Sequence, residues 1–99
     1  MFCDLGRYEL SARGPMCGHD VDPLIDAILL LPNDSAATID LRDVFAIDVA
    51  AASVLASAVR RGHRRGVEFS VLVGSEASSA TLAAAGLSRI TAYRHHSFV

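Results

Sequence analysis

The sequence of 99 residues contains no lysine, so its nine basic residues are all arginine, and the formal net charge is −2. Proteins that hold nucleic acid or an anionic membrane by bulk charge are strongly basic. This charge balance therefore argues against both of those partners. We attribute the missing lysine to a GC-rich genome rather than to a function.

Cysteine is scarce too, since Cys3 and Cys17 are the only two in the sequence. Two thiols do not make a disulfide framework, and neither a Cys-x-x-Cys pair nor a Cys/His zinc spacing occurs. The N-terminal residues 1–7 lack the basic and apolar regions of a signal peptide. The longest aliphatic run, residues 28–31, is far too short to span a membrane. We therefore expect a protein of the reducing cytoplasm with no membrane insertion, no metal and no cofactor.

Apolar residues make up 52% of the sequence and charged residues 20%, a balance typical of a globular protein. A chain of this size buries roughly two thirds of its unfolded surface, which is enough for one core. We therefore expect a single domain over residues 1–99, with its core in about residues 8–92 and a flexible tail at 94–99.

The first third of the chain predicts two strands and a helix. Residues 2–5 and 8–12 have strand character and are joined by a tight turn, and Gly14-Pro15 is expected to end the second strand. Residues 16–20 are expected to form a loop. Asp22 before Pro23 predicts an acid-capped helix that runs to about Leu31. Its apolar stripe is Leu24, Ile28 and Leu31.

The most informative stretch is residues 39–59. A strand over residues 36–41 is followed by an expected turn at Arg42-Asp43 and a second apolar patch at 44–47. Asp48 then caps an alanine-rich helix that runs to about Arg65. The apolar stripe of this helix is Ala51, Leu55, Ala58, Val59 and Gly62. The opposite, polar face carries Ser53, Ser57, Arg60 and Arg64.

The last third begins with Gly66, which has the place of a C-cap glycine. A strand over residues 67–73, a turn at Gly74-Ser75 and a helix over 76–85 ended by Gly86 follow. Residues 90–93 form either a short strand or a helical tail. Strands that alternate with helices predict an α/β fold, with a small mixed sheet of four to five strands and helices mainly on one face.

Short motifs at these spacings resemble the STAS family, which includes bacterial anti-sigma factor antagonists and the cytoplasmic tails of sulfate transporters. The resemblance covers about residues 8–92. The motifs that carry it are Asp40-Leu41-Arg42-Asp43-Val44, Ile47-Asp48-Val49-Ala50-Ala51, Gly66, Val71-Leu72-Val73 and Gly86-Leu87. In that family an antagonist binds an anti-sigma factor that is also a serine kinase, and phosphorylation of the antagonist ends the binding.

The sequence departs from the family pattern at the position where phosphorylation controls partner binding. Ala50 stands where the family has the serine that the kinase phosphorylates, and Ala51 replaces the glycine after it. The acid of the family's Gly-x-Leu-Asp loop falls on Cys17, counted from Gly14. The resemblance therefore implies a partner-binding surface at the Asp48 helix start that is not phosphorylated at the usual site.

The candidate partner-binding residues are Phe45, Asp48, Ala50, Ser53, Ser57, Arg60 and Cys17. Each has a simpler interpretation as well. Asp48 is explained by helix capping alone, Ser53 by a solvated helix face rather than a displaced phosphorylation site, and Cys17 by a half-buried loop position. The run Arg60, Arg61, Arg64 and Arg65 is either a docking patch for an acidic partner or a helix end that complements the dipole.

Other sites have weaker support. The pair His95-His96, with His19 or His63, fits no known metal spacing. Gly74-Ser75-Glu76 opens a helix but lacks the lysine and the glycines of a phosphate-binding loop. No catalytic set stands out, so an enzyme is not expected.

Two functions stay open from the sequence. The first is a protein-binding regulator that resembles anti-sigma factor antagonists. The second is an accessory subunit on the ATPase of an ABC-type lipid transporter. A small nucleotide-dependent enzyme is a distant third, and homodimerisation is left open.

Overall fold

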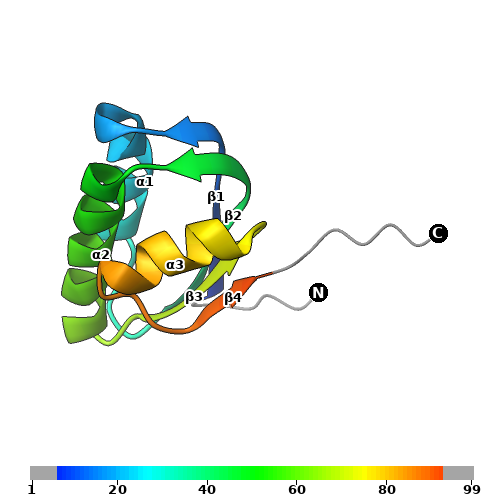
Figure 1. Ribbon diagram of the computed structural model, residues 1–99. Coiled ribbons are helices and arrows are strands. Elements are labelled where there is room, and N and C mark those ends of the chain that lie inside the picture. Colours follow the sequence, from blue (N-terminus) through cyan, green and yellow to red (C-terminus); the bar gives the residue numbers. More distant parts are fainter. Residues whose placement is uncertain (1–6, 93–99) are drawn as a thin grey trace, which may run out of the picture.

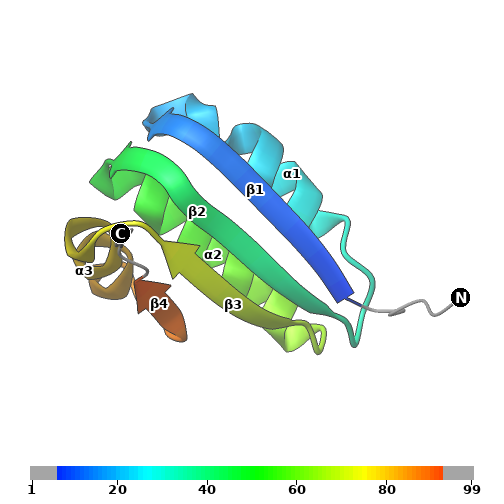
Figure 2. The same ribbon diagram turned by 90° about the vertical axis from the view of Figure 1, so that its right-hand side faces the viewer.

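The computed structural model describes residues 7–92. Its strands are β1 (Arg7–Met16), β2 (Ala36–Ile47), β3 (Glu68–Val73) and β4 (Ile90–Ala92). Its helices are a short 3-10 helix η1 (Gly18–Val21) and the α-helices α1 (Asp22–Leu29), α2 (Val49–Arg64) and α3 (Glu76–Ala84). Figure 1 shows the sheet edge-on with the helices to one side of it, and Figure 2 shows the sheet from its open face.

The predicted α/β fold with helices on one face is confirmed. The sheet has four strands in the order β1-β2-β3-β4. We expected a mixed sheet, but all three pairings within residues 7–92 are parallel. Helical crossovers between successive strands bring each new strand back in the same direction. The further strand predicted at residues 2–5 lies outside the described part of the chain.

The core lies between the sheet and the helices. Ile39, Leu41, Val71 and Val73 of the central strands are buried and belong to one hydrophobic cluster with helix residues such as Leu55. On the other face, polar residues such as Thr38 and Ser70 lie side by side in the register. No described element covers that face, and its polar side chains explain how a parallel sheet tolerates water there.

Strand β1 is longer than predicted, because it continues through Gly14 and Pro15 to Met16. The pairing with β2 shifts register between Ser11 and Arg13 and again before Pro15. These β-bulges accommodate Gly14 and Pro15 within the strand, and Gly14 adopts the positive φ of 77° there. Among the described strands β1 is at the edge of the sheet, where a proline without an N–H group is tolerated.

The turn predicted at Arg42-Asp43 is wrong, since β2 runs unbroken from Ala36 to Ile47. The pairing with β1 persists on both sides of this point, with Asp43 opposite Arg13. Arg42 donates from Nε to Asp40 Oδ1 over 3.0 Å and from Nη2 to Oδ2 over 2.8 Å. These hydrogen bonds lower the pKa of Asp40 below its ordinary value of 3.8.

The start of α1 also differs from expectation. Its N-cap is Val21, and no side chain caps the helix, because η1 leads directly into it. Asp22 is therefore the first helical residue, and the loop predicted at residues 16–20 is largely strand end and 3-10 helix. The predicted buried positions Leu24, Ile28 and Leu31 are confirmed.

The remaining glycine and strand predictions hold. Gly66 and Gly86 follow α2 and α3 with φ of 87° and 105°, as C-terminal glycines require. Of the two alternatives for the end of the described chain, the structure has the strand, β4, which pairs with β3.

Candidate functional site

Asp48 caps α2, as the sequence predicted. Its backbone is extended, with φ −85° and ψ 166°, and its Oδ1 accepts a hydrogen bond from the Ala51 N–H over 2.7 Å. An acidic N-cap satisfies one free amide and places negative charge at the positive end of the helix dipole. The start of α2 is therefore capped by the Asp48 side chain, although Asp48 itself is exposed.

The end of β1 lies directly beside this helix start. The Asp48 N–H donates to the Met16 carbonyl over 3.1 Å, which places Cys17, the next residue, next to the cap. The sequence placed both Asp48 and Cys17 in one site, and the structure brings them together. Cys17 is a free thiol and is exposed, so the expected half-buried position is wrong.

Large apolar side chains are exposed around the start of α2. Phe45 is 75% exposed and Val49 is 74% exposed, whereas Val54, five residues further along α2, is 45% exposed. Phe45 was a predicted site residue. Val49 lies at the predicted Asp48 helix start but was not singled out, and Val54 was missed. The available signal was the helical spacing, which places both valines outside the buried stripe of Ala51, Leu55 and Ala58.

Two shallow grooves flank this part of α2, and Ser53 lies on the ridge between them. The groove toward α1 has a volume of about 300 Å³, and that toward α3 about 360 Å³. The first is lined by Ile25, Leu29, Ser53, Val54, Ser57, Ala58 and Arg61. The second is lined by Val49, Ser53, Ala80, Thr81, Ala84 and Ala85.

We call the set at this end of the molecule the α2 surface. It comprises Phe45 from the end of β2 and Val49, Ala50, Ser53, Val54 and Ser57 from α2. Ala50 is exposed and is the second residue of the helix. Ser53 is exposed and Ser57 is half-buried. The set combines apolar and small polar side chains on a capped helix and on the end of the strand before it, a combination suited to contact with another protein.

The four arginines near the end of α2 do not form one patch. Arg65 donates to the carbonyl of Leu31 over 2.6 Å and to Asn33 Oδ1 over 3.1 Å. It thereby ties the end of α1 to α2. Arg61 lines the α1 groove, whereas Arg60 and Arg64 line a third cavity at the far end of α2. Arg60, which the sequence assigned to the partner-binding residues, lines this third cavity and neither of the two grooves beside Ser53.

The weaker sequence candidates have structural explanations where they are described. A Cβ on Gly74 would lie 2.6 Å from the Arg42 carbonyl oxygen, so this glycine permits close packing of the chain. Ser75 Oγ accepts from the Ser78 N–H over 3.1 Å and caps α3.

The predicted histidine group is not assembled within the described residues. His95 and His96 lie outside them, as does the side chain of His19, and His63 lines the third cavity. Within residues 7–92, no group of three His, Cys, Asp or Glu side chains is placed to hold a metal ion.

A comparison with known protein families shows to which family the chain belongs. The family model of the STAS domain matches residues 8–97. The chain belongs to the STAS family. Searches of curated proteins and of solved structures returned no match to it. STAS domains are regulatory folds that generally mediate protein–protein interactions. No helix within the described residues is long and apolar enough to cross a membrane.

Proposed function

We propose that this STAS protein is a cytoplasmic, non-enzymatic regulator that binds a kinase-like anti-sigma factor through the α2 surface. The observation that carries the proposal is the exposure of Phe45 and Val49, at 75% and 74%, beside a helix start fixed by Asp48. Asp48 and Cys17 lie at the rim of this surface.

The physical basis is the burial of apolar area on a rigid support. Each of these side chains still exposes most of its area, and covering it in a complex contributes about 1–2 kcal/mol. The cap on α2 holds the surface in place before binding, so little ordering is needed when the partner arrives. The grooves on both sides of Ser53 offer places for partner side chains to enter.

Ala50 is the reason for proposing that partner binding is not regulated by phosphorylation at the family's usual site. Its side chain is exposed at the second position of α2, which the family resemblance matches to the phosphorylated serine. A phosphate there would add nearly two negative charges to the apolar surface and oppose binding. Alanine has no hydroxyl, so the chain stays in the binding state. Ser53 lies about one turn further along and is not proposed as a substitute.

A site-specific photocrosslink tests the proposal. Benzoylphenylalanine in place of Phe45 would be irradiated in the native cell, and the same residue in place of Ser70, on the open sheet face, serves as the control. We expect a histidine-kinase-like ATPase that regulates a sigma factor to be captured from Phe45 and not from Ser70.

Two outcomes would overturn the proposal. Capture of an ABC transporter ATPase from Phe45 would instead establish the accessory-subunit function. Equal capture from Ser70 would show that the α2 surface is not the binding surface.

A further inference from the structure

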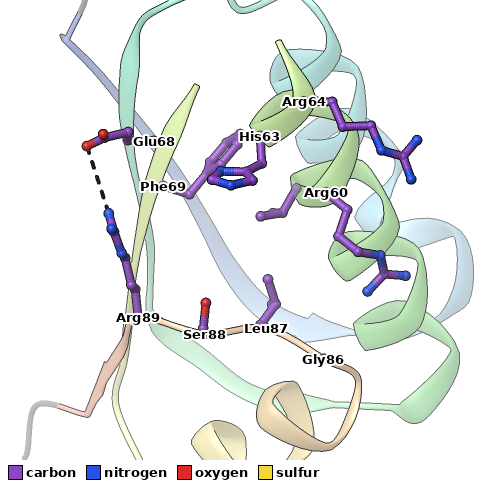
Figure 3. A pocket seen from close by; sticks show the side chains of 10 residues that line it. Arg60, His63, Arg64, Glu68, Phe69, Gly86, Leu87, Ser88 and Arg89 are labelled. Carbon is purple, nitrogen blue, oxygen red and sulfur yellow. Dashed lines mark ion pairs between the residues drawn. The ribbon is translucent and has the colours of Figure 1, made fainter. Parts of the chain in front are cut away.

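A third cavity, of about 480 Å³, lies at the far end of α2 from the Asp48 cap. One wall is the last two turns of α2, the floor is the beginning of β3, and the other wall is the segment that joins α3 to β4 (Figure 3). Its volume is within the range of about 300–1,000 Å³ that small-molecule sites occupy. The proposed partner surface does not use it.

The floor of the cavity is apolar and preformed. Phe69 and Leu87 are only 6% and 7% exposed, and half-buried Val59 continues the apolar lining on α2. The Phe69 ring lies against Gly62, where a Cβ would come within 2.6 Å of the ring atom Cζ. The missing side chain at Gly62 therefore makes room for the ring and fixes the floor.

The rim of the cavity is strongly basic in an otherwise acidic chain. Arg60, Arg64 and Arg89 contribute three positive charges and Glu68 one negative charge, which leaves +2 with His63 neutral, whereas the whole chain carries −2. Arg60 and Arg64 project from α2, and Arg89 stands on the opposite side of the cavity (Figure 3). The Arg89–Glu68 ion pair, at 3.8 Å, is highly exposed and adds little.

The loop between α3 and β4 lies close to the Arg60 guanidinium group. A Cβ on Gly86 would lie 3.0 Å from Arg60 Nη1, so glycine lets the arginine pass close to the loop. Arg89 has a positive φ of 57°, a conformation that few non-glycine residues adopt. Ser88, between Leu87 and Arg89, adds a hydroxyl to the same lining.

From this arrangement we propose that the cavity binds a small organic anion with an apolar body about one ring in size and a single carboxylate or phosphate group. The apolar body lies on Phe69 and Leu87. The anionic group is held by Arg60 and Arg64, because planar guanidinium groups suit both kinds of oxyanion. This function is independent of partner binding at the other end of α2.

Titration by NMR tests the proposal with four probes. Phenyl phosphate and phenylacetate carry both required features, whereas inorganic phosphate and benzyl alcohol carry one each. We expect the two complete probes to shift the resonances of Phe69, Leu87 and Ser88 in a saturable manner. We expect each single-feature probe to bind about tenfold more weakly, because it lacks either the charge-assisted contacts or the apolar contact. The stronger of the two complete probes identifies the preferred headgroup.

Arginine variants distinguish binding of the probes in this cavity from nonspecific attraction of anions to the protein. Arg60→Gln combined with Arg64→Gln should weaken the complete probes about tenfold or more, while Arg13→Gln, on exposed β1, should leave them unchanged. Circular dichroism checks that all the variants fold.

The proposal is wrong if neither complete probe shifts these resonances at 10 mM. It is also wrong if inorganic phosphate binds as tightly as phenyl phosphate, or if the double variant binds as well as the wild type.

Discussion

Replacing Asp48 with alanine tests whether this residue acts as a helix cap, a partner contact or both. The contacts of Asp48 in the structure set the expected loss of stability. Asp48→Ala removes one hydrogen bond of 2.7 Å to the Ala51 N–H and the charge beside the helix dipole. Loss of an N-cap of this kind costs about 1 kcal/mol of the free energy of unfolding, and the exposure of Asp48 argues against a larger value.

Asp48→Asn is the matched control, because its amide oxygen still accepts the hydrogen bond and only the charge is lost. We expect it to cost a few tenths of a kcal/mol. Urea unfolding followed by circular dichroism measures both variants, and the dependence on urea concentration should stay at the wild-type slope while the midpoint moves.

The binding of the two variants then separates the roles. If Asp48 acts through capping, Asp48→Asn keeps the affinity for the partner near that of the wild type. Equal destabilisation by alanine and asparagine would refute the capping argument. Wild-type stability together with lost binding in Asp48→Asn would show that the carboxylate is a direct contact.

Three further predictions follow from single positions. Gly74→Ala should lower the free energy of unfolding by about 2 kcal/mol in urea, because its Cβ would meet the Arg42 carbonyl oxygen at 2.6 Å; a neutral result would contradict that contact. Asp40→Asn should cost less than about 1 kcal/mol at pH 7, since the pair is partly exposed. Because folding lowers the pKa of Asp40, its ionised form stabilises the fold above pH 3.8, and the difference from Asp40→Asn should vanish as the pH falls further; a constant difference would argue against the linkage. With the cognate kinase and ATP, Ala50→Ser should gain phosphate and lose binding, whereas phosphate on Ser53 of the wild type would refute the loss of control.

Three helix ends set by nearby residues could be predicted from the sequence, whereas the local cap signal at Asp22 failed because η1 leads directly into α1. Asp48, Gly66 and Gly86 each mark a helix end by local chemistry, and all three are where the pattern placed them. The alternation of strand and helix was enough for the fold class, because an apolar stripe must be covered by another element.

Features set by distant contacts were not readable. Pairing with β2 carries β1 through Gly14-Pro15 despite a local signal to stop. Arg65 resembled a surface charge until its hydrogen bond to Leu31, 34 residues away, was seen.

The central claim is that the α2 surface binds the partner, and Val49→Asp tests it most directly. Val49 is 74% exposed at the first position of α2, where an acidic residue favours the helix, so the fold should be retained or slightly stabilised. The measurement is the affinity of this variant for the protein captured by the photocrosslink, compared with the wild type. We predict at least about a tenfold loss, because the new charge would be buried in the interface. Unchanged affinity in a fully folded Val49→Asp protein would contradict the account.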